Sequence, residues 1–298
     1  MKHQNLKLET TNRAAVTTGV AWPDQKKSCL FIAFDFDAET AWFDEHAADS
    51  KQLVRMSHGG YGARVGVPKV LELLHRLELS ATFFVPGWVA ETYTQMCERI
   101  LKAGHEIGHH GYYHLKPSIG AGGLEQIDSL EQSYAEIDRG FEALERCLGV
   151  KPIGYRAPCG ENYDLILQYL SEKGIKYSSS WRDDIMPYRH ILDSGKTGPL
   201  ELPANSAFDD WNHGVVKGSS RNMLSREQVL SIWNDELNQT HAWGGLTTTI
   251  FHPQVSGRPS RFMILEQFLT YAQTLDDLWI TKGEVILNHI DKNGLMTD

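Results

Sequence analysis

The residues best suited to chemistry in this sequence are carboxylates and histidines at the ends of predicted strands. Asp35 and Asp37 close the apolar run Cys29–Phe36, which has the composition of a buried strand. Residues two apart on a strand point to the same side, so both carboxylates can enter one cavity. There, one can bind a metal ion while the other accepts a proton. The alternative is an ordinary Asx turn or helix cap at the strand end.

Two histidines four residues apart form the second signal. His110 and His114 enclose the sequence Gly-Tyr-Tyr. On a helical turn this spacing puts both imidazoles on one face, close enough to share a metal ion. With one aspartate they make a three-ligand set that leaves positions open for water and substrate, as a catalytic metal requires. The alternative is a polar surface loop.

His252 and Arg156 complete the candidate site. His252 follows the apolar run Thr247–Phe251 and precedes Pro253, where a buried strand can deliver a side chain to the mouth of a pocket. It is a candidate general acid, and the alternative is a hydrogen-bonded core histidine. Arg156 ends another predicted strand and can orient a nearby carboxylate, or it forms a weak surface ion pair.

These residues can meet only in a fold that brings the ends of several strands together. Short apolar runs alternate with longer segments of helical period, as expected for parallel strands joined by crossover helices, and such folds place active sites at the carboxyl ends of the strands. The predicted strands are residues 29–36, 81–85, a short strand running into 105–110, 153–156, 175–179, 200–203 and 247–251. The predicted helices are one that starts at Pro68, then 91–103, 124–148, 163–173 and 225–239, the last with a capping box of Ser225 and Gln228.

The rest of the sequence bounds the class of protein. The glycine-rich stretches 57–62 and 119–123 are predicted as loops, and the lack of repeats or linkers favours one domain. A formal net charge of -9 repels phosphate backbones and anionic headgroups, so we expect a small neutral or cationic substrate and neither nucleic acid nor membrane as a partner. Four cysteines without a C-x-x-C pair are expected to be reduced thiols. Residues 1–10 lack the apolar run of a signal peptide, so we expect a cytoplasmic protein.

Taken together, these segments resemble the polysaccharide deacetylase superfamily, the NodB-homology hydrolases, with the motifs in family order over nearly the whole chain. The first motif appears as residues 34–39, with Phe36 inserted between aspartates that are adjacent in many members. The second, a pair of histidines, lies within residues 104–114. The third appears as residues 156–158, Arg-Ala-Pro, and the last as His-Pro at 252–253.

The resemblance implies a role for each of these residues. The implied set is Asp37, His110 and His114 as metal ligands, Asp35 as general base, His252 as general acid, Arg156 holding the base, and Asp183 or Asp184 steadying a catalytic partner. Zinc is the first choice of metal because nitrogen and oxygen ligands with an open position suit it, and Co2+, Ni2+ or Mn2+ can substitute. Further candidates for the pocket wall or for contacts around these groups are Glu161, Tyr61, Trp42, Trp88, Trp181 and Trp211. The roles of His105, His109 and Glu161 stay open.

The spaced Asp-Phe-Asp, the Gly-Gly-Tyr-Gly loop and the extended segment 252–260 look like an intracellular branch of this superfamily. That branch is similar to bacterial cyclic imide hydrolases, to peptidoglycan-deacetylase-like proteins and, more distantly, to a metal-free allantoinase. The implied fold is α/β, an irregular (β/α) barrel of about seven parallel strands in a single domain. Residues 28–298 would form this domain after an N-terminal extension, residues 1–27. A homo-oligomer, tetramer or dimer, is expected.

The resemblance ranks the possible activities. Ring-opening hydrolysis of small cyclic imides or amides, with a metal, comes first, because a cytoplasmic enzyme does not meet mature cell-wall polymer. Deacetylation of an N-acetylated sugar or peptidoglycan precursor comes second, and a metal-independent, allantoinase-like hydrolysis third. A binding protein that keeps the barrel without catalysis is the rival from another class, and the intact motif residues argue against it.

Overall fold

The computed structural model describes residues 17–43, 53–118, 129–214 and 223–297. Most of the strands belong to a seven-stranded sheet of order β3-β4-β5-β6-β7-β9-β8. These strands are β3 (Ala33–Asp35), β4 (Thr82–Val85), β5 (Glu106–His109), β6 (Gly154–Tyr155), β7 (Tyr177–Ser178), β9 (Thr197–Glu201) and β8 (Tyr188–Ile191). Neighbouring strands are parallel except β8, which runs antiparallel to β9.

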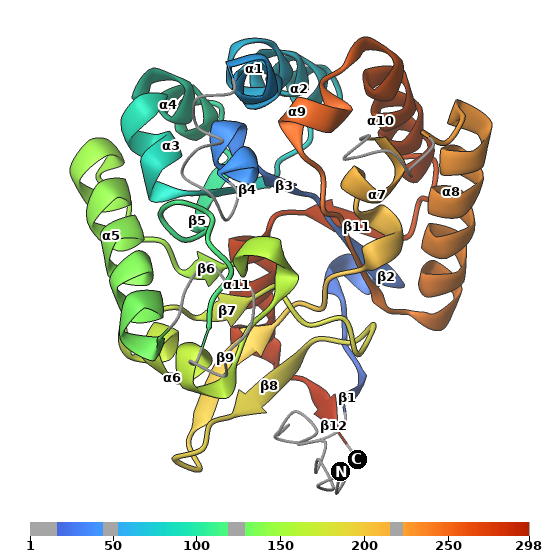
Figure 1. The fold of residues 1–298 in the computed structure, drawn as a ribbon. Helices are drawn as coiled ribbons and strands as arrows, with labels where there is room; N and C mark the ends of the chain where they lie inside the picture. The colour runs from blue at the N-terminus through green and yellow to red at the C-terminus, as the bar shows by residue number, and fades with distance from the viewer. Residues whose placement is uncertain (1–16, 44–52, 119–128, 215–222, 298) are drawn as a thin grey trace, which may run out of the picture.

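A second sheet of three parallel strands continues from the first. Strand β2 (Ser28–Phe31) lies between β10 (Leu246–Thr248) and β11 (Leu278–Thr281) and runs into β3 after a single residue. The predicted strand 29–36 is therefore one extended segment that changes sheets. Beyond β10, a bridge between Phe34 and Phe251 keeps the two sheets in register. The result is the predicted α/β fold, an irregular barrel wall surrounded by helices (Figure 1).

The helices cover the outside of this wall (Figure 1). The longer ones are α1 (Leu53–Tyr61), α2 (Val67–Arg76), α3 (Gly87–Thr92), α4 (Thr94–Lys102), α5 (Leu130–Leu148), α6 (Asp164–Glu172), α8 (Arg226–Trp243), α10 (Pro259–Ala272) and α11 (Gly283–Asn293). Helix α8 begins with the predicted capping box of Ser225 and Gln228. Helix α5 begins at Leu130, because Ser129 has an extended backbone and caps the helix by accepting the Gln132 N–H with its side chain. The predicted start at residue 124 is therefore wrong, and residue 124 itself lies outside the described residues.

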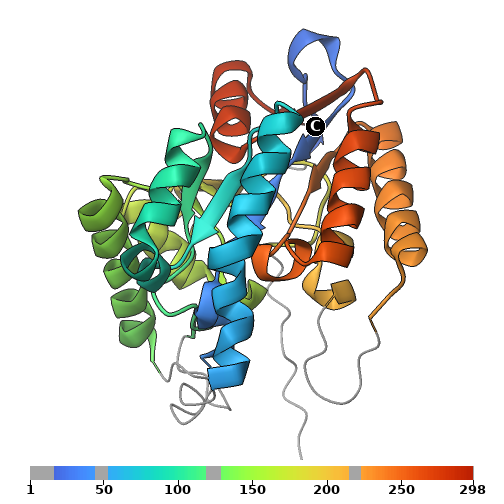
Figure 2. The ribbon, with the colours of Figure 1, turned by 90° about the horizontal axis from the view of Figure 1, so that it is seen from above.

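One loop prediction is wrong. Residues 57–62 are helical, because α1, the π-helical turn η4 (Gly62–Gly66) and α2 follow one another without a break, as one long rod on the outside of the molecule (Figure 2). The glycines serve close packing here. A Cβ on Gly59 would lie 2.4 Å from the Ala38 carbonyl oxygen, and one on Gly66 would lie 2.1 Å from that of Pro253. The other glycine-rich stretch, 119–123, lies outside the described residues.

The predicted N-terminal extension packs on the domain where the structure describes it. Strand β1 (Thr17–Gly19) pairs antiparallel with β12 (Met296–Thr297), which places these two segments side by side (Figure 1). Trp22 is buried, and its indole N–H donates to the Gly244 carbonyl over 2.9 Å. The boundary at residue 28 stays a prediction. Within the described part of the chain, no helix is both long and apolar enough to cross a bilayer.

The main core lies between the strands and the helices α2, α8 and α10. Phe34 stacks on Phe83 with ring centroids 5.1 Å apart, and Phe251 packs against Trp233 at 5.0 Å. All four side chains are almost completely buried. Burying large aromatic rings on both sides of the Phe34–Phe251 bridge stabilises the point where the two sheets meet. Asp35, the last residue of β3, lies at this same point.

Candidate active site

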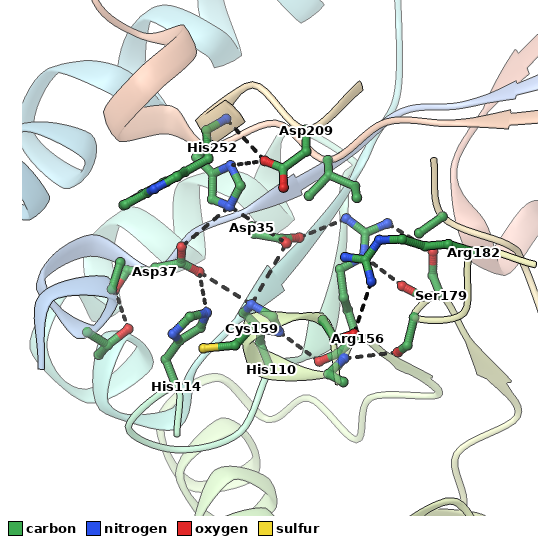
Figure 3. Close-up of a pocket in the computed structure, with 18 of the residues that line it drawn as sticks. Asp35, Asp37, His110, His114, Arg156, Cys159, Ser179, Arg182, Asp209 and His252 are labelled. Atoms are coloured by element: carbon green, nitrogen blue, oxygen red, sulfur yellow. Dashed lines mark hydrogen bonds and ion pairs between the residues drawn. The ribbon is translucent and has the colours of Figure 1, made fainter. Parts of the chain in front are cut away.

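A cavity of about 240 Å³ opens at the carboxyl ends of the parallel strands. All six residues predicted for the catalytic and metal roles line it: Asp35, Asp37, His110, His114, Arg156 and His252. Figure 3 shows these side chains pointing toward one another from separate elements. Carboxyl ends of neighbouring parallel strands meet at one edge, which is why residues so far apart in sequence converge.

Asp37, His110 and His114 form a set of three potential metal ligands. One oxygen and two nitrogens from these residues lie within 4.8 Å of one another. Asp37 Oδ1 is 3.4 Å from His110 Nε2 and 3.8 Å from His114 Nε2. Asp37 Oδ1 and His110 Nε2 are buried without a hydrogen-bond partner in the described part of the chain. Leaving two buried polar atoms unsatisfied is costly unless a cation binds between them, so this donor set fits a divalent metal such as Zn2+.

The tautomer of His110 suits this role. Its Nδ1 lies 2.7 Å from the carbonyl oxygen of Arg156. A carbonyl only accepts, so Nδ1 carries a hydrogen, and in the neutral ring the lone pair then lies on Nε2, which faces the cavity. Burial lowers the pKa of His110, but the carboxylates of Asp35 and Asp37 outweigh it and raise the pKa; a cation bound between them would repel the proton and favour the neutral ring. Burial lowers the pKa of His114 to about 4, which keeps this imidazole neutral and able to bind a metal at neutral pH. Burial alone would raise the pKa of Asp37, but His114, His110 and His252 outweigh it and hold the pKa well below its usual range.

The histidine pair does not lie on a helical turn, contrary to the prediction. Strand β5 ends at His109, and the following loop has positive φ angles of 73° at Gly111 and 61° at His114. The loop is held by Glu136 of α5, whose Oε1 accepts the backbone N–H groups of Tyr112 and Tyr113. This chain reversal brings the two imidazoles of the pair together, with ring centroids 4.9 Å apart. The spacing correctly predicted a shared site, but for the wrong geometric reason.

Asp35 is held by a buried ion pair. Arg156 Nη1 lies 2.8 Å from Asp35 Oδ1, and the same guanidinium donates to the backbone and the side chain of Ser179. It also packs over the ring of Phe84, 4.5 Å from the centroid. These contacts fix the carboxylate and leave Oδ2 toward the cavity, 3.8 Å from His110 Nε2. Arg156 therefore holds the carboxylate that the resemblance assigned to it, and the role of Asp35 as general base stays a prediction.

His252 is held with its Nε2 facing the cavity. Its Nδ1 donates to Asp210 Oδ1 over 2.7 Å, and its Nε2 lies 3.7 Å from Asp37 Oδ2. Burial would lower the pKa of His252, but the adjacent carboxylate of Asp210 dominates and raises it to about 10. The imidazole therefore carries a proton at neutral pH, as a general acid must. Trp211 packs edge-on against its ring at 5.3 Å.

The two aspartates predicted to steady a catalytic partner lie outside the cavity. Asp183 and Asp184 do not line the cavity. Asp183 accepts from the Tyr188 hydroxyl over 2.9 Å, and Asp184 caps the N–H groups that follow it in the chain. Asp210 holds His252 instead, and Asp209 lines the cavity beside it. Asp209-Asp210 is a second Asp-Asp pair in the sequence, and no local signal separates it from the first.

Of the aromatic candidates, Trp211 lines the cavity. Trp42 is buried behind it, with ring centroids 5.1 Å apart. Trp88 packs at 5.1 Å against Phe43, which also forms part of the wall. Trp181 packs on His190 at 4.6 Å and lines a neighbouring groove instead of the cavity.

The remaining candidates lie away from the cavity. Tyr61 donates its hydroxyl hydrogen to the Gly257 carbonyl, and Glu161 is exposed beside the groove that Trp181 lines. His105 Nδ1 accepts from the Ala81 N–H at the opposite end of the strands. His109 donates to the Ile137 carbonyl of α5 and accepts from the N–H of the glycine at position 111. His105 and His109 therefore make structural hydrogen bonds outside the cavity.

Gln254 is a site residue that sequence reasoning missed. Its side chain is buried and donates to Asp37 Oδ2 over 3.1 Å, which turns Oδ1 toward the two histidines. Its position two residues after His252 is the signal that could have found it. Residues that orient a metal ligand commonly contribute about 10- to 100-fold to metal affinity.

We therefore expect Gln254→Ala to lower zinc affinity by about 10- to 100-fold. Competition with a chromophoric chelator, without substrate, measures this directly. Gln273→Ala is the matched control, because this glutamine donates to the Leu77 carbonyl on the outer surface. Equal zinc affinity in the two variants would show that Gln254 does not position Asp37.

A second prediction concerns pH. Asp210→Asn should move the alkaline limb of the kcat/KM profile down by about one to three pH units, because the neighbouring negative charge that raises the pKa of His252 is lost. A general acid acts only while protonated, so activity falls as pH rises through its pKa. A metal cation in the cavity lowers this pKa in both proteins and leaves the direction unchanged.

Asp209→Asn is the control for that profile. Asp209 Oδ1 lies 4.0 Å from His252 Nδ1, against 2.7 Å for Asp210, so the limb should move less. Profiles of kcat/KM from pH 6 to 11 on the wild type and both variants make the comparison. An unchanged limb in Asp210→Asn would remove His252 from the role of acid.

The parallel strands end in a carboxylate held by an arginine, an aspartate–histidine cluster and a histidine held by an aspartate. This combination of an α/β fold and a site is typical of deacetylase-type hydrolases. The profile of the polysaccharide deacetylase family matches residues 28–178, about half of the chain, and the chain belongs to this family.

Two relatives extend the similarity to the whole chain. A peptidoglycan deacetylase of Helicobacter pylori is 26% identical over 297 residues, which cover 90% of this chain and 98% of the relative. The crystal structure of a putative polysaccharide deacetylase from Mycobacterium smegmatis superimposes with a TM-score of 0.86 at 33% identity, covering 97% of each chain. The structure of Puue allantoinase, at 20% identity and a TM-score of 0.77 over 94% of each chain, shares the fold.

Proposed function

We propose that this protein is a metal-dependent hydrolase that opens the ring of small cyclic imides or related amides. The observation that carries the proposal is the convergence, in one small cavity, of three features. Asp37 Oδ1 and His110 Nε2 have no hydrogen-bond partner among the described residues, Arg156 holds the Asp35 carboxylate, and Asp210 raises the pKa of His252. A divalent cation held by Asp37, His110 and His114 would supply Lewis acidity and lower the pKa of bound water. Zinc is our first choice.

The chain's own residues account for the proton transfers. Asp35 accepts a proton from the attacking water through Oδ2, while Arg156 keeps Oδ1 engaged. His252 gives its Nε2 proton to the departing ring nitrogen, and Asp210 stabilises the imidazolium before this transfer. Attack at one carbonyl and protonation of the nitrogen break the C–N bond and leave a half-amide with a carboxylate.

The size and walls of the cavity favour a compact substrate. A volume of about 240 Å³ suits a single ring better than a polymer segment, and Phe43 and Trp211 offer flat apolar surfaces. The other part of the wall is polar, with Ser179 and Ser180 at the end of β7. A planar imide has this same division into an apolar ring and polar carbonyl edges.

Deacetylation of an N-acetylated sugar or peptidoglycan precursor is the second candidate. The specific observation in its favour is the similarity to the Helicobacter pylori peptidoglycan deacetylase along 90% of this chain. The same residues would serve, with acetate as the acid product. A metal-independent reaction is the third candidate, and the three converging ligand atoms argue against it. The proposal includes a homo-oligomer in the cytoplasm, which sizing in solution and localisation of a tagged chain would test.

The test compares substrates and metal states in one series. Succinimide, hydantoin and an N-acetylglucosamine oligomer are offered to the protein as purified, after chelation, and after zinc is restored. Ring opening that disappears with the chelator and returns with zinc is the expected result. Acetate release without ring opening would support the deacetylase candidate. Activity that is indifferent to chelation would overturn the metal site.

A further inference from the structure

Arg182 places a positive charge at the cavity that the proton transfers do not use. It lines both the cavity and the adjoining groove, and Figure 3 shows it on the side of the site where Ser179 lies. Its side chain is largely exposed to solvent. Within the described ranges, no carboxylate forms an ion pair with it, and its Nη1 donates to the Gly160 carbonyl over 3.0 Å.

The guanidinium is held against the loop that carries the third motif. Gly160 has a φ of 72°, and a Cβ at this position would lie 2.3 Å from Arg182 Nη2. The positive φ favours glycine here, and the absence of a side chain leaves room for the guanidinium, which a Cβ would displace. The contact with a backbone carbonyl fixes one edge of the guanidinium and leaves the other N–H groups available to a ligand.

A buried carboxylate fixes the backbone that leads into Arg182. Glu201 Oε1 accepts the N–H groups of Ser180 and Trp181 over 2.7 Å and 3.0 Å, and its Oε2 accepts from His190 over 2.9 Å. Both members of the His190–Glu201 pair are almost completely buried. A cation held at both its backbone and its head loses little conformational freedom when it binds an anion.

Charge pairing singles out Arg182 among the cations of the site. Arg156 is neutralised by Asp35 at 2.8 Å, and His252 by Asp210 at 2.7 Å. The excess negative charge of the whole chain, -9, would weaken the binding of any anion that lacked a local partner. A guanidinium presents two parallel N–H groups that match a carboxylate.

We propose that Arg182 selects substrates in which the scissile ring carries a carboxylate group, so that the substrate class is acidic cyclic imides and ureides. This inference rests on the proposed function and names the chemistry of its substrate. The ring lies against Phe43 and Trp211 with a carbonyl toward the ligand cluster, and the carboxylate pairs with the free edge of Arg182 at the mouth. The net negative charge of the chain then disfavours the binding of anions in general, while Arg182 binds a carboxylate at the mouth of the cavity.

The experiment uses two hydantoins of similar size that differ in charge, hydantoin-5-acetate and 5-ethylhydantoin. The ratio of their kcat/KM values is compared in the wild type, Arg182→Ala, Arg182→Lys and Arg76→Ala, all loaded with zinc. Arg76 is the matched control, because its guanidinium pairs with Glu266 on the outer face. We expect the ratio to favour the acid in the wild type and to fall by about 10- to 100-fold in Arg182→Ala, mainly through KM, the effect of losing a charge-assisted hydrogen bond.

The lysine variant should keep part of the preference, and Arg76→Ala should keep all of it. A wild type that prefers 5-ethylhydantoin, or a ratio that is the same in Arg182→Ala, would overturn the proposal. Calorimetric binding of both compounds to chelated protein keeps this test separate from the proposed function. If no ring is opened in any metal state, the proposed function fails. Tighter binding of the acid that depends on Arg182 would still support the charge selection, and equal binding would overturn it.

Discussion

Replacing Asp35 with asparagine should lower kcat/KM by about 100- to 10,000-fold, the range measured when a general base is lost. Asparagine has the shape of aspartate and still offers an oxygen to Arg156, so the fold should persist. It cannot accept the proton of the attacking water. The substrate that the wild type opens fastest is used for steady-state kinetics, and zinc content is measured on the same samples.

The zinc content separates this prediction from simple damage to the site. Asp35 Oδ2 lies 3.8 Å from His110 Nε2, so Asp35 borders the ligand cluster without belonging to the set that fits the metal. Zinc occupancy close to that of the wild type is therefore expected. Asp276→Asn, an exposed aspartate on the far side of the fold, is the control for the change of charge. Activity within tenfold of the wild type would refute a role for Asp35 as base.

Replacing His110 with alanine should remove both activity and the response of stability to zinc. A ligand that binds only the folded state at 100 times its dissociation constant adds about 2.7 kcal/mol of stability, which is visible as a rise in Tm. His110 is buried, its Nε2 is 3.4 Å from Asp37 Oδ1, and it belongs to the three-residue set that fits the metal, so its loss should remove one of the three ligands. Thermal melts with and without zinc test this without any substrate.

The control for that experiment is His75→Ala, on an exposed position of α2. This variant should melt at a higher temperature with zinc, as the wild type does, and His110→Ala should show no such rise. A normal zinc response in His110→Ala would mean that the metal binds elsewhere, for example between Asp209, Asp210 and His252, the other cluster of possible ligands among the described residues.

The site was more predictable from the sequence than the loops around it. Asp35 and His252 each end a short apolar run, His110 follows a short predicted strand, and the carboxyl ends of parallel strands converge whatever the exact loop geometry is. The order of motifs along the chain carried the same information. Local pattern therefore sufficed for the residues that project directly from strand ends.

The errors arose where long-range packing decides. The glycines of residues 57–62 have low helical propensity, yet the segment is helical and packs closely on the fold: a Cβ on Gly59 would lie 2.4 Å from the Ala38 carbonyl oxygen. Asp183-Asp184 and Asp209-Asp210 cannot be told apart from their local sequence. The long-range bridge between Asp209 and Ile250 places the second pair beside His252. Gln254 was missed because its position two residues after His252 does not by itself reveal the long-range contact with Asp37.

The strand that changes sheets has a consequence for how this protein can diversify. Backbone hydrogen bonds join Asp35 N to Phe251 O at 2.7 Å and Phe251 N to Ala33 O at 3.2 Å. The main chain itself therefore sets the spacing between Asp35, the proposed proton acceptor, and His252, the proposed proton donor, which follows Phe251. Arg182 and the aromatic wall, by contrast, come from connecting segments. Substitutions in those segments can therefore change the substrate preference while the spacing of Asp35 and His252 stays constant. The reaction and the substrate specificity can then evolve separately.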